Sequence, residues 1–352
     1  MNNVQLTRDR VLTVHAGTHK TASTYIQSRL LANAKILAKA GVFTDYPQEI
    51  TRKFKPLVAA LQAGDWSAWK LYLQMVPAHC NHILVSAEQF SQSLANPKIF
   101  KPLTKLLLKH GYRTKIIVFL RDQPDYTNAH FVHSTRRLYH HMPFNDYVDM
   151  QLNECKRFYD YEYLFSSLIK EPGIQIDFLP YLSSLGDPFE RLMRHLGFKP
   201  NTAWKSHSEG AVNIQPGHKG VWLAQEISKQ LFEQYGIIDG KGSPLKNRGA
   251  AVRRIAEREG WAKDRYYGFD EAMFEKVVEN YAESNDRFAQ DVWGCSWRKV
   301  YPLHRLDRQV YELPASGTEH TKMLALTQEA LDFIVDEAMF KTKKHWTSLF
   351  LN

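Results

Sequence analysis

A lysine flanked by hydroxyl side chains follows the first apolar run of the sequence, in the segment His15-Ala-Gly-Thr-His-Lys-Thr-Ala-Ser-Thr24. It stands between a glycine-containing turn and the start of a helical pattern. Backbone N–H groups in the first turn of a helix lack intrahelical partners and carry partial positive charge, so such a turn binds anions. Lys20 adds a full charge, and Thr21, Ser23 and Thr24 add hydroxyl donors. The alternative is that Thr21 or Ser23 only caps the helix.

This turn differs from the phosphate loop of nucleoside triphosphatases. That loop has four residues between its first glycine and a Gly-Lys-Ser/Thr sequence. Here only Thr18 and His19 separate Gly17 from Lys20, and the residue before the lysine is histidine. The spacing therefore argues against a kinase or a triphosphatase.

A carboxylate follows the next buried strand-like run, since Glu88 comes just after the run His82–Ser86. Parallel sheets place their ligand crevice beyond the carboxyl ends of their strands, so Glu88 is the leading candidate for a general base. His19 is the alternative base. A structural acid paired with a nearby Lys or Arg is the other interpretation of Glu88. We interpret His15, at a strand end, as a structural histidine.

The elements that must position these residues alternate between short apolar runs and helical stretches. This alternation predicts an α/β fold, a three-layer sandwich with a central parallel sheet and extra C-terminal helices. The strands are predicted over 11–14, 82–86, 115–120 and 174–179. The helices are predicted over 21–40, 100–110, 125–139, 145–165, 188–196, 269–292 and 327–339, with a basic, glycine-rich surface loop over 240–249. We expect one α/β domain over 1–300 and a partly helical extension over 301–352.

Composition restricts the class of protein. The 352 residues are 44% hydrophobic, which is enough for a sizeable core, and the net charge of +9 attracts anions such as nucleotides, nucleic acid or acidic polysaccharide. No apolar run has the length of a membrane span, and the polar residues 1–10 do not resemble a signal peptide. The three cysteines are far apart and form no disulfide or metal pattern. We therefore expect a cytoplasmic protein without integral membrane contact.

Residues 11–25 resemble the 5′-phosphosulfate-binding loop of sulfotransferases, especially the bacterial branch with loops of the form HxGxxKTGTT. The resemblance extends to four further segments and covers most of residues 11–294. Those segments are His82-Ile-Leu-Val-Ser-Ala-Glu88, Lys115-Ile-Ile-Val-Phe-Leu-Arg-Asp-Gln123, Leu192-Met-Arg-His-Leu-Gly-Phe198 and Asn280-Tyr-Ala-Glu-Ser-Asn285. It implies a P-loop-like sulfotransferase fold that transfers a sulfuryl group from 3′-phosphoadenosine 5′-phosphosulfate to a hydroxyl of a carbohydrate or small metabolite.

The resemblance also implies roles for particular residues. Lys20 would neutralise charge as the bond to the leaving phosphate breaks, with Glu88 or His19 as the base. Arg121 would bind the 3′-phosphate through its planar guanidinium, and Lys219 faintly matches a second 3′-phosphate segment. No metal is expected, because the cationic side chain and the amides supply the charge. The residues that would hold the 5′-phosphate are Gly17, Thr18, His19, Lys20, Thr21, Ala22, Ser23 and Thr24.

Two residues depart from the pattern of this family. Ala22 stands where the family usually has glycine, and a Cβ there would crowd the approach of backbone to phosphate. Eight positions after Arg121, the family's serine is replaced by Ala129. Thr127, Asn128 or His130 would have to compensate. These departures leave open a second interpretation, a nucleotide-binding relative with weak catalysis.

The acceptor side is indicated by the segment 130–141, HFVHSTRRLYHH. On a helix, His133, Arg136, Arg137 and His140 recur every three to four residues and share a broad face. Such a face suits an acidic oligosaccharide or another hydroxylated acceptor, or it is an ordinary solvated surface. A nucleic-acid-binding protein is a third interpretation, but no reader module is present and we expect no nucleic-acid partner.

Overall fold

The computed structural model describes residues 10–45, 54–154, 156–206, 215–235 and 249–349, which fall into two compact units. Unit 1 combines 1–126, 156–212 and 281–303, and unit 2 combines 127–155, 213–280 and 304–352. The domain boundary predicted at residue 300 stays a prediction, because these units are defined by contacts in space. The glycine-rich loop predicted from residue 240 lies, up to 248, outside the described residues.

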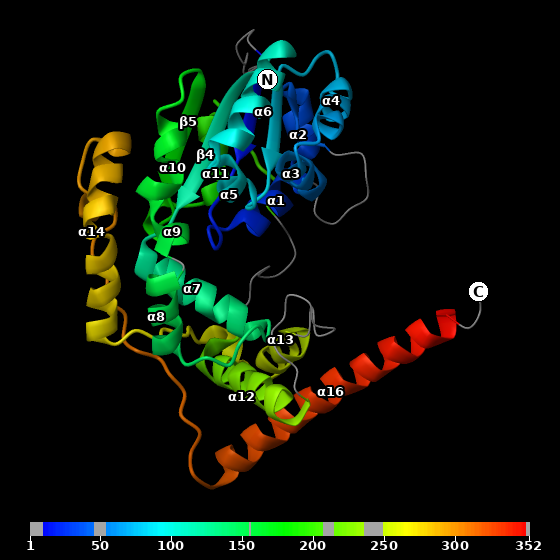
Figure 1. Cartoon of the computed structure of the whole chain (residues 1–352), viewed down its shortest axis with the longest axis vertical. Helices are drawn as coiled ribbons and strands as arrows, with labels where there is room; N and C mark the ends of the chain where they lie inside the picture. The colour runs from blue at the N-terminus through cyan, green and yellow to red at the C-terminus, as the bar shows by residue number, and fades with distance from the viewer. Residues whose placement is uncertain (1–9, 46–53, 155, 207–214, 236–248, 350–352) are drawn as a thin grey trace. The chain divides into compact units, whose positions relative to one another are not determined.

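Unit 1 is built on a five-stranded parallel sheet with the strand order β2-β3-β1-β4-β5. The strands β4 and β5 are labelled in Figure 1. The strands are β1 (Val11–His15), β2 (Val42–Phe43), β3 (His82–Ser86), β4 (Arg113–Leu120) and β5 (Ile174–Pro180). The central strand β1 pairs with β3 on one side and with β4 on the other. The α/β fold with a central parallel sheet is therefore confirmed.

Helices cover both faces of this sheet, because alternate residues of each strand point to opposite layers. In β4, Ile116 and Val118 face one apolar layer, while Ile117 and Phe119 face the other. The first layer contains α3 (Lys55–Ala63), α4 (Trp66–Gln74), α5 (Phe90–Leu94), α6 (Pro97–Lys109), α10 (Tyr161–Ile169) and α15 (Trp297–Val300). The second contains α1 (Ser23–Ala32), α2 (Ala34–Lys39) and α11 (Pro188–His195).

Unit 2 has helices around a smaller apolar core, in which Leu223, Ile255 and Met323 are buried. Its helices are α8 (Phe144–Glu154), α12 (Gly217–Tyr235), α13 (Gly249–Arg258) and α16 (Thr318–Leu349). Two helices belong to both units: α7 (Gln123–Arg136) and α14 (Glu271–Trp293). Short helical turns are α9 (Lys156–Tyr159), η1 (Ser183–Leu185) and η2 (Trp261–Lys263).

Several predicted helices differ from the observed ones. The helix predicted over 21–40 is broken at Asn33, whose buried side chain bonds the backbone of Lys205 through both its amide groups. The helix predicted over 145–165 is three helices, and the third begins after Asp160, which caps it by accepting from Tyr163 N. The last helix begins at Thr318, earlier than predicted.

The carboxyl end of β4 is held by hydrogen bonds from one other segment of unit 1, residues 297–301. Tyr301 Oη donates to Leu120 O at 2.7 Å. Asp122, whose side chain is 14% exposed, accepts from Trp297 Nε1 at 2.7 Å and from Arg298 Nη1 at 2.8 Å. Burial raises the pKa of Asp122, and the Arg298 guanidinium opposes that rise. A carboxylate removed from water in this way depends on its cation.

We expect Arg298→Met to lower the free energy of unfolding by about 3 kcal/mol, because it leaves the largely buried Asp122 carboxylate without its cation. The loss should shrink as the pH falls through the raised pKa of Asp122, since a protonated carboxyl needs no counterion. Urea denaturation at several pH values measures both effects. The control Arg287→Met removes an exposed pair with Glu162 and should change little. Equal losses in the two variants would contradict the proposed anchoring.

Candidate anion site at the carboxyl edge of the sheet

The loop between β1 and α1 continues along β4 after β1 itself has ended. Ala16 N donates to Ile117 O at 2.9 Å, and Thr18 donates to Phe119 O through both N and Oγ1, at 3.2 and 3.0 Å. Thr21 Oγ1 then donates to Thr18 O at 2.6 Å and closes the turn. These bonds hold the segment predicted to bind an anion at the carboxyl edge of the sheet, at the N-terminus of α1.

Two residues of this loop have left-handed backbone conformations, Lys20 at φ 67° and Ala22 at φ 60°. L-residues adopt this region at a cost of about 1 kcal/mol, whereas glycine does not pay it. Position 22 therefore has a backbone conformation that favours glycine, and this chain adopts it with alanine. Left-handed residues in such turns curl successive N–H groups toward one side, as in anion-binding nests.

A cluster of polar side chains lies against Gly17. A Cβ on Gly17 would lie 2.7 Å from Ser23 Oγ, 2.8 Å from Thr21 Oγ1 and 3.3 Å from His15 Nε2. Among the described residues, Ser23 Oγ and His15 Nε2 have no hydrogen-bond partner, although both are buried. Buried polar atoms without partners are costly, so the arrangement fits a site completed by an oxygen-rich ligand.

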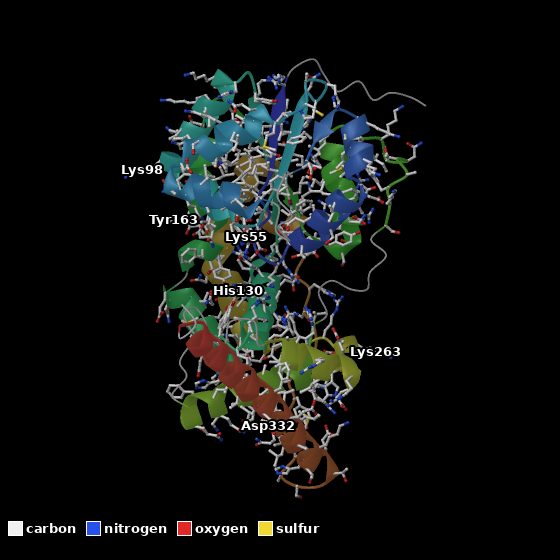
Figure 2. The ribbon with its side chains drawn as sticks, turned by 90° about the vertical axis from the view of Figure 1, so that its right-hand side faces the viewer. Lys55, Lys98, His130, Tyr163, Lys263 and Asp332 are labelled. Carbon is white, nitrogen blue, oxygen red and sulfur yellow. The ribbon has the colours of Figure 1, made fainter. Side chains whose placement is uncertain are left out.

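Glu88 lies beyond β3 at this edge of the sheet. Its carboxylate is 3.6 Å from His19 Nδ1, an ion-pair distance. A hydrogen bond from His19 and the positive charges of His19, Lys20 and Lys55 hold the pKa of Glu88 below its usual value, against the opposing effect of burial. Lys55, labelled in Figure 2, begins α3 and belongs to no motif in the sequence, so sequence reasoning missed it.

Arg121 follows β4 directly and meets the same loop. Its Nη1 donates to Lys20 O at 3.3 Å, and its guanidinium lies 5.8 Å from the centre of the Tyr181 ring. Tyr161 Oη donates to Arg121 O at 2.7 Å and fixes the backbone there. Unit 1 therefore brings together His19, Lys20, Glu88 and Arg121, which come from three separate parts of the sequence.

The residues predicted to complete the 3′-phosphate site belong to unit 2. Ala129 is buried on α7, and its neighbour Asn128 donates to Tyr266 O and accepts from Gly268 N, both at 3.0 Å. Both the nitrogen and the oxygen of the Asn128 side-chain amide are therefore already hydrogen-bonded. Lys219 Nζ pairs with Glu319 at 2.6 Å. The nucleotide-binding role of Lys219 stays a prediction.

The predicted basic helical face is wrong in its geometry, because α7 ends at Arg136. Leu138 takes a left-handed φ of 58° and buries its side chain in the core of unit 2, so Arg137 and His140 are not on the helix with His133. His140 Nε2 lies 2.8 Å from Ser134 Oγ. Acceptor binding by these four residues stays a prediction.

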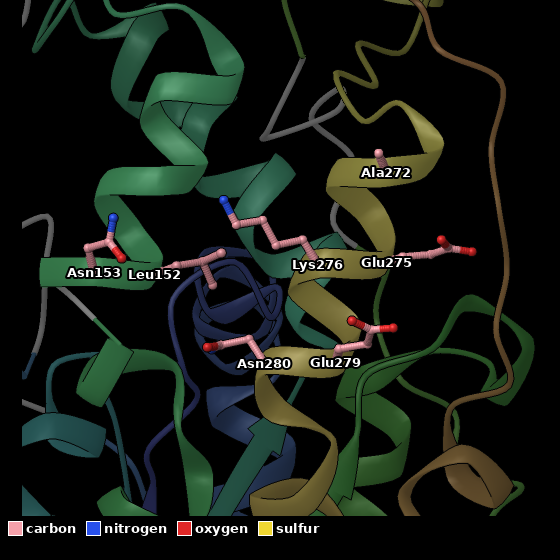
Figure 3. A pocket seen from close by; sticks show the side chains of 7 residues that line it. All are labelled: Leu152, Asn153, Ala272, Glu275, Lys276, Glu279 and Asn280. Carbon is pink, nitrogen blue, oxygen red and sulfur yellow. The ribbon is translucent and has the colours of Figure 1, made fainter.

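Unit 2 also contains a polar groove of about 590 Å³ between α8 and α14 (Figure 3). Among the described residues, the buried Asn280 Nδ2 has no partner, while Lys276 pairs with Asp149 at 2.6 Å. The lining residues of α14 share one face of the helix. In the sequence this face has the pattern of an ordinary amphipathic helix, so the sequence gives no signal for the groove. The groove is lined by Leu152, Asn153, Ala272, Glu275, Lys276, Glu279 and Asn280.

Comparisons with known proteins leave the site to be argued from its own residues. No family model and no curated protein matches this sequence. The chain is similar to the crystal structure of a retinol dehydratase in complex with retinol and PAP, at 11% identity and a TM-score of 0.30, over 80% of this chain and 83% of that one. A likeness at this level defines neither the family nor the chemistry of this chain.

Two kinds of feature are absent from the described residues, a membrane-spanning helix and a metal-binding cluster. No helix in this part of the chain is both long and apolar enough to cross a membrane. No group of three or more His, Cys, Asp or Glu side chains within the same residues has an arrangement that would hold a metal ion.

The left-handed conformation of Ala22 predicts an unusual response to glycine. Ala22→Gly relieves the backbone cost, so we expect no loss of unfolding free energy. Ala59→Gly, at an exposed position inside α3, should cost about 1 kcal/mol. Chemical denaturation of both variants checks the difference. An equal loss in Ala22→Gly would mean that the loop conformation described here is wrong.

Proposed function

We propose that this chain is a sulfotransferase that moves a sulfuryl group from 3′-phosphoadenosine 5′-phosphosulfate to a hydroxyl group. One observation carries the proposal. Arg121 and the loop lysine, a hundred residues apart, meet at the edge of one sheet, with Arg121 Nη1 3.3 Å from Lys20 O. A nucleotide with phosphates on both its 5′ and 3′ positions needs two such cationic groups, one for each end.

The loop side chains suit the 5′-phosphosulfate end of this donor. The hydroxyls of Ser23 and Thr24, the loop amides and the Lys20 ammonium would bind its oxygens, and Arg121 would bind the 3′-phosphate. In the reaction the sulfur–oxygen bond to the 5′-phosphate breaks and a bond from sulfur to the acceptor oxygen forms. Negative charge then grows on the leaving phosphate, where Lys20 neutralises it.

The acceptor hydroxyl must lose its proton, and the geometry favours His19 and Glu88 acting as a pair. A carboxylate with a lowered pKa is ionised at neutral pH but is a weak base. The Glu88 carboxylate beside His19 Nδ1 would instead orient the imidazole and stabilise its protonated form. We therefore assign the proton to His19 Nε2 and the orienting role to Glu88.

The acceptor is proposed as a carbohydrate or a small hydroxylated metabolite, and an acidic glycan is included because of the net positive charge. We propose a cytoplasmic location, which suits Cys80 and Cys295, both of which are free thiols.

A weakly catalytic nucleotide-binding relative is the second candidate. It is favoured by Ala129 and by the engaged amide of Asn128.

Two ligands separate the roles of the cations. Arg121→Ala should weaken binding of adenosine 3′,5′-bisphosphate about tenfold, a loss of about 1.4 kcal/mol, and leave adenosine 5′-phosphate unchanged. Lys20→Ala should weaken both ligands and abolish labelled-sulfate transfer. Isothermal titration measures the affinities, with the exposed Lys98→Ala as the control. Full transfer by Lys20→Ala, or no binding by the unaltered chain, would refute the proposed function.

The pH dependence of transfer identifies the base. Because Glu88 is assigned the orienting role and not the proton transfer, Glu88→Gln should slow transfer while the acidic limb of the rate profile is kept. His19→Gln should remove that limb and slow transfer about a hundredfold. Labelled-sulfate transfer to a panel of hydroxylated acceptors measures both, with Glu190→Gln as the exposed control. If Glu88→Gln removes the limb and His19→Gln keeps it, Glu88 itself is the base.

A further inference from the structure

A second histidine, His15, lies beneath the loop. It is the last residue of β1 and is fully buried, with Phe119 edge-on to its ring at 5.6 Å. Its Nδ1 lies 2.7 Å from Ser86 Oγ on β3, within hydrogen-bond distance. Its Nε2 faces the space beside Gly17, together with Ser23 Oγ. The two ring nitrogens therefore face the end of β3 and the start of α1.

Packing alone does not explain why His15 Nε2 has no hydrogen-bond partner among the described residues. If the ring only filled the apolar layer, phenylalanine would be the more stable residue there. A buried nitrogen without a hydrogen bond costs about 1–3 kcal/mol of stability, and phenylalanine has no such atom. Ser23 Oγ is in the same condition: the side chain is 4% exposed and has no hydrogen-bond partner among the described residues. Two neighbouring polar atoms without partners indicate that the arrangement is completed by something that binds there.

Burial also fixes the charge of this ring. It lowers the pKa of His15 to about 3, so the imidazole is neutral wherever the protein is active. A neutral imidazole donates from one nitrogen and accepts at the other. If Ser86 Oγ donates to Nδ1, then Nε2 carries the hydrogen and is the donor.

We propose that His15 is a positioning residue whose Nε2–H donates through one water molecule to Ser23 Oγ, so that the Ser23 hydroxyl donates its hydrogen to the 5′-phosphate of the donor nucleotide. This inference rests on the proposed function. The chain of donors runs from Ser86 Oγ through the imidazole to Ser23 Oγ and ends on the anion.

The direction of this chain matters because phosphate oxygens only accept hydrogen bonds. A serine hydroxyl has one hydrogen, and in a site with a basic nitrogen it would donate to that nitrogen. Ser23 would then present lone pairs to the anion and repel it. Holding the hydrogen on Nε2 removes that competitor. Gly17 permits the arrangement, because a side chain there would collide with Ser23 Oγ and Thr21 Oγ1.

Two amide substitutions test the inference, because each places an amide group at the position of one ring nitrogen. His15→Gln extends a donor to the Nε2 position, and His15→Asn reaches only the Nδ1 position, where it keeps the contact with Ser86. We expect His15→Gln to bind adenosine 3′,5′-bisphosphate within about threefold of the unaltered chain. His15→Asn and Ser23→Ala should each bind about tenfold more weakly, near 1.4 kcal/mol. The double variant of His15→Asn and Ser23→Ala should be no weaker than either single one.

The opposite results are equally clear. If His15→Asn and His15→Gln bind the bisphosphate equally, His15 has only a structural role. The same conclusion follows if the losses of affinity parallel losses in melting temperature, or if they add in the double variant. Nitrogen-15 NMR of the unliganded protein gives a second measurement that needs no variant: an Nδ1–H tautomer overturns the inference. Failure of the unaltered chain to bind the bisphosphate would instead refute the proposed function, and the inference with it.

Discussion

The site depends on a constraint at the centre of the sheet: the loop after β1 continues to hydrogen-bond to β4 once β1 has ended. The bonds from Ala16 and Thr18 to Ile117 and Phe119 keep the loop beside that strand. The residue after β4 is then next to the loop lysine, which is why Arg121 reaches Lys20 O. A loop that left the sheet earlier would separate the two cations, and the proposed site for a doubly phosphorylated nucleotide would be lost.

The same constraint explains why the loop contains unfavourable features. The short turn from the central strand into the helix contains two residues in the left-handed conformation. Lys20 and Ala22 adopt this conformation although neither is glycine. The loop also buries polar atoms of Ser23 and His15 that have no partner among the described residues. Strain and unsatisfied groups of this kind persist where the surrounding structure enforces them, and they concentrate at functional sites. The apolar layers on both faces of the sheet supply the stability that offsets them.

The sequence predicts the sheet well, because buried parallel strands are nearly continuous apolar runs and the pattern of β4 has few alternatives. It predicts the helix ends poorly. Asn33 breaks its helix through a contact with Lys205, far along the chain, and Leu138 ends α7 by turning into an apolar core that only the fold creates. Within the site, the spacing around Lys20 predicts an anion loop. The chain's own residues give no local signal for Lys55, and the interpretation of His15 as structural missed its unpaired nitrogen.

The balance of charge at the sheet edge bears on the class of reaction. Lys20, Lys55 and Arg121 are cationic, and His19, Lys20 and Lys55 hold the pKa of the Glu88 carboxylate below its usual value. The carboxylate of Asp125 lies 4.0 Å from Arg121, so three cationic side chains lie with two carboxylates and the field beside the loop is net positive. A transfer reaction that leaves negative charge on a phosphate is favoured by such a field, since the charge appears where cations and amides are already in place. A reaction that builds positive charge there would be opposed by the same residues, which is why the arrangement suits group transfer from an anionic donor.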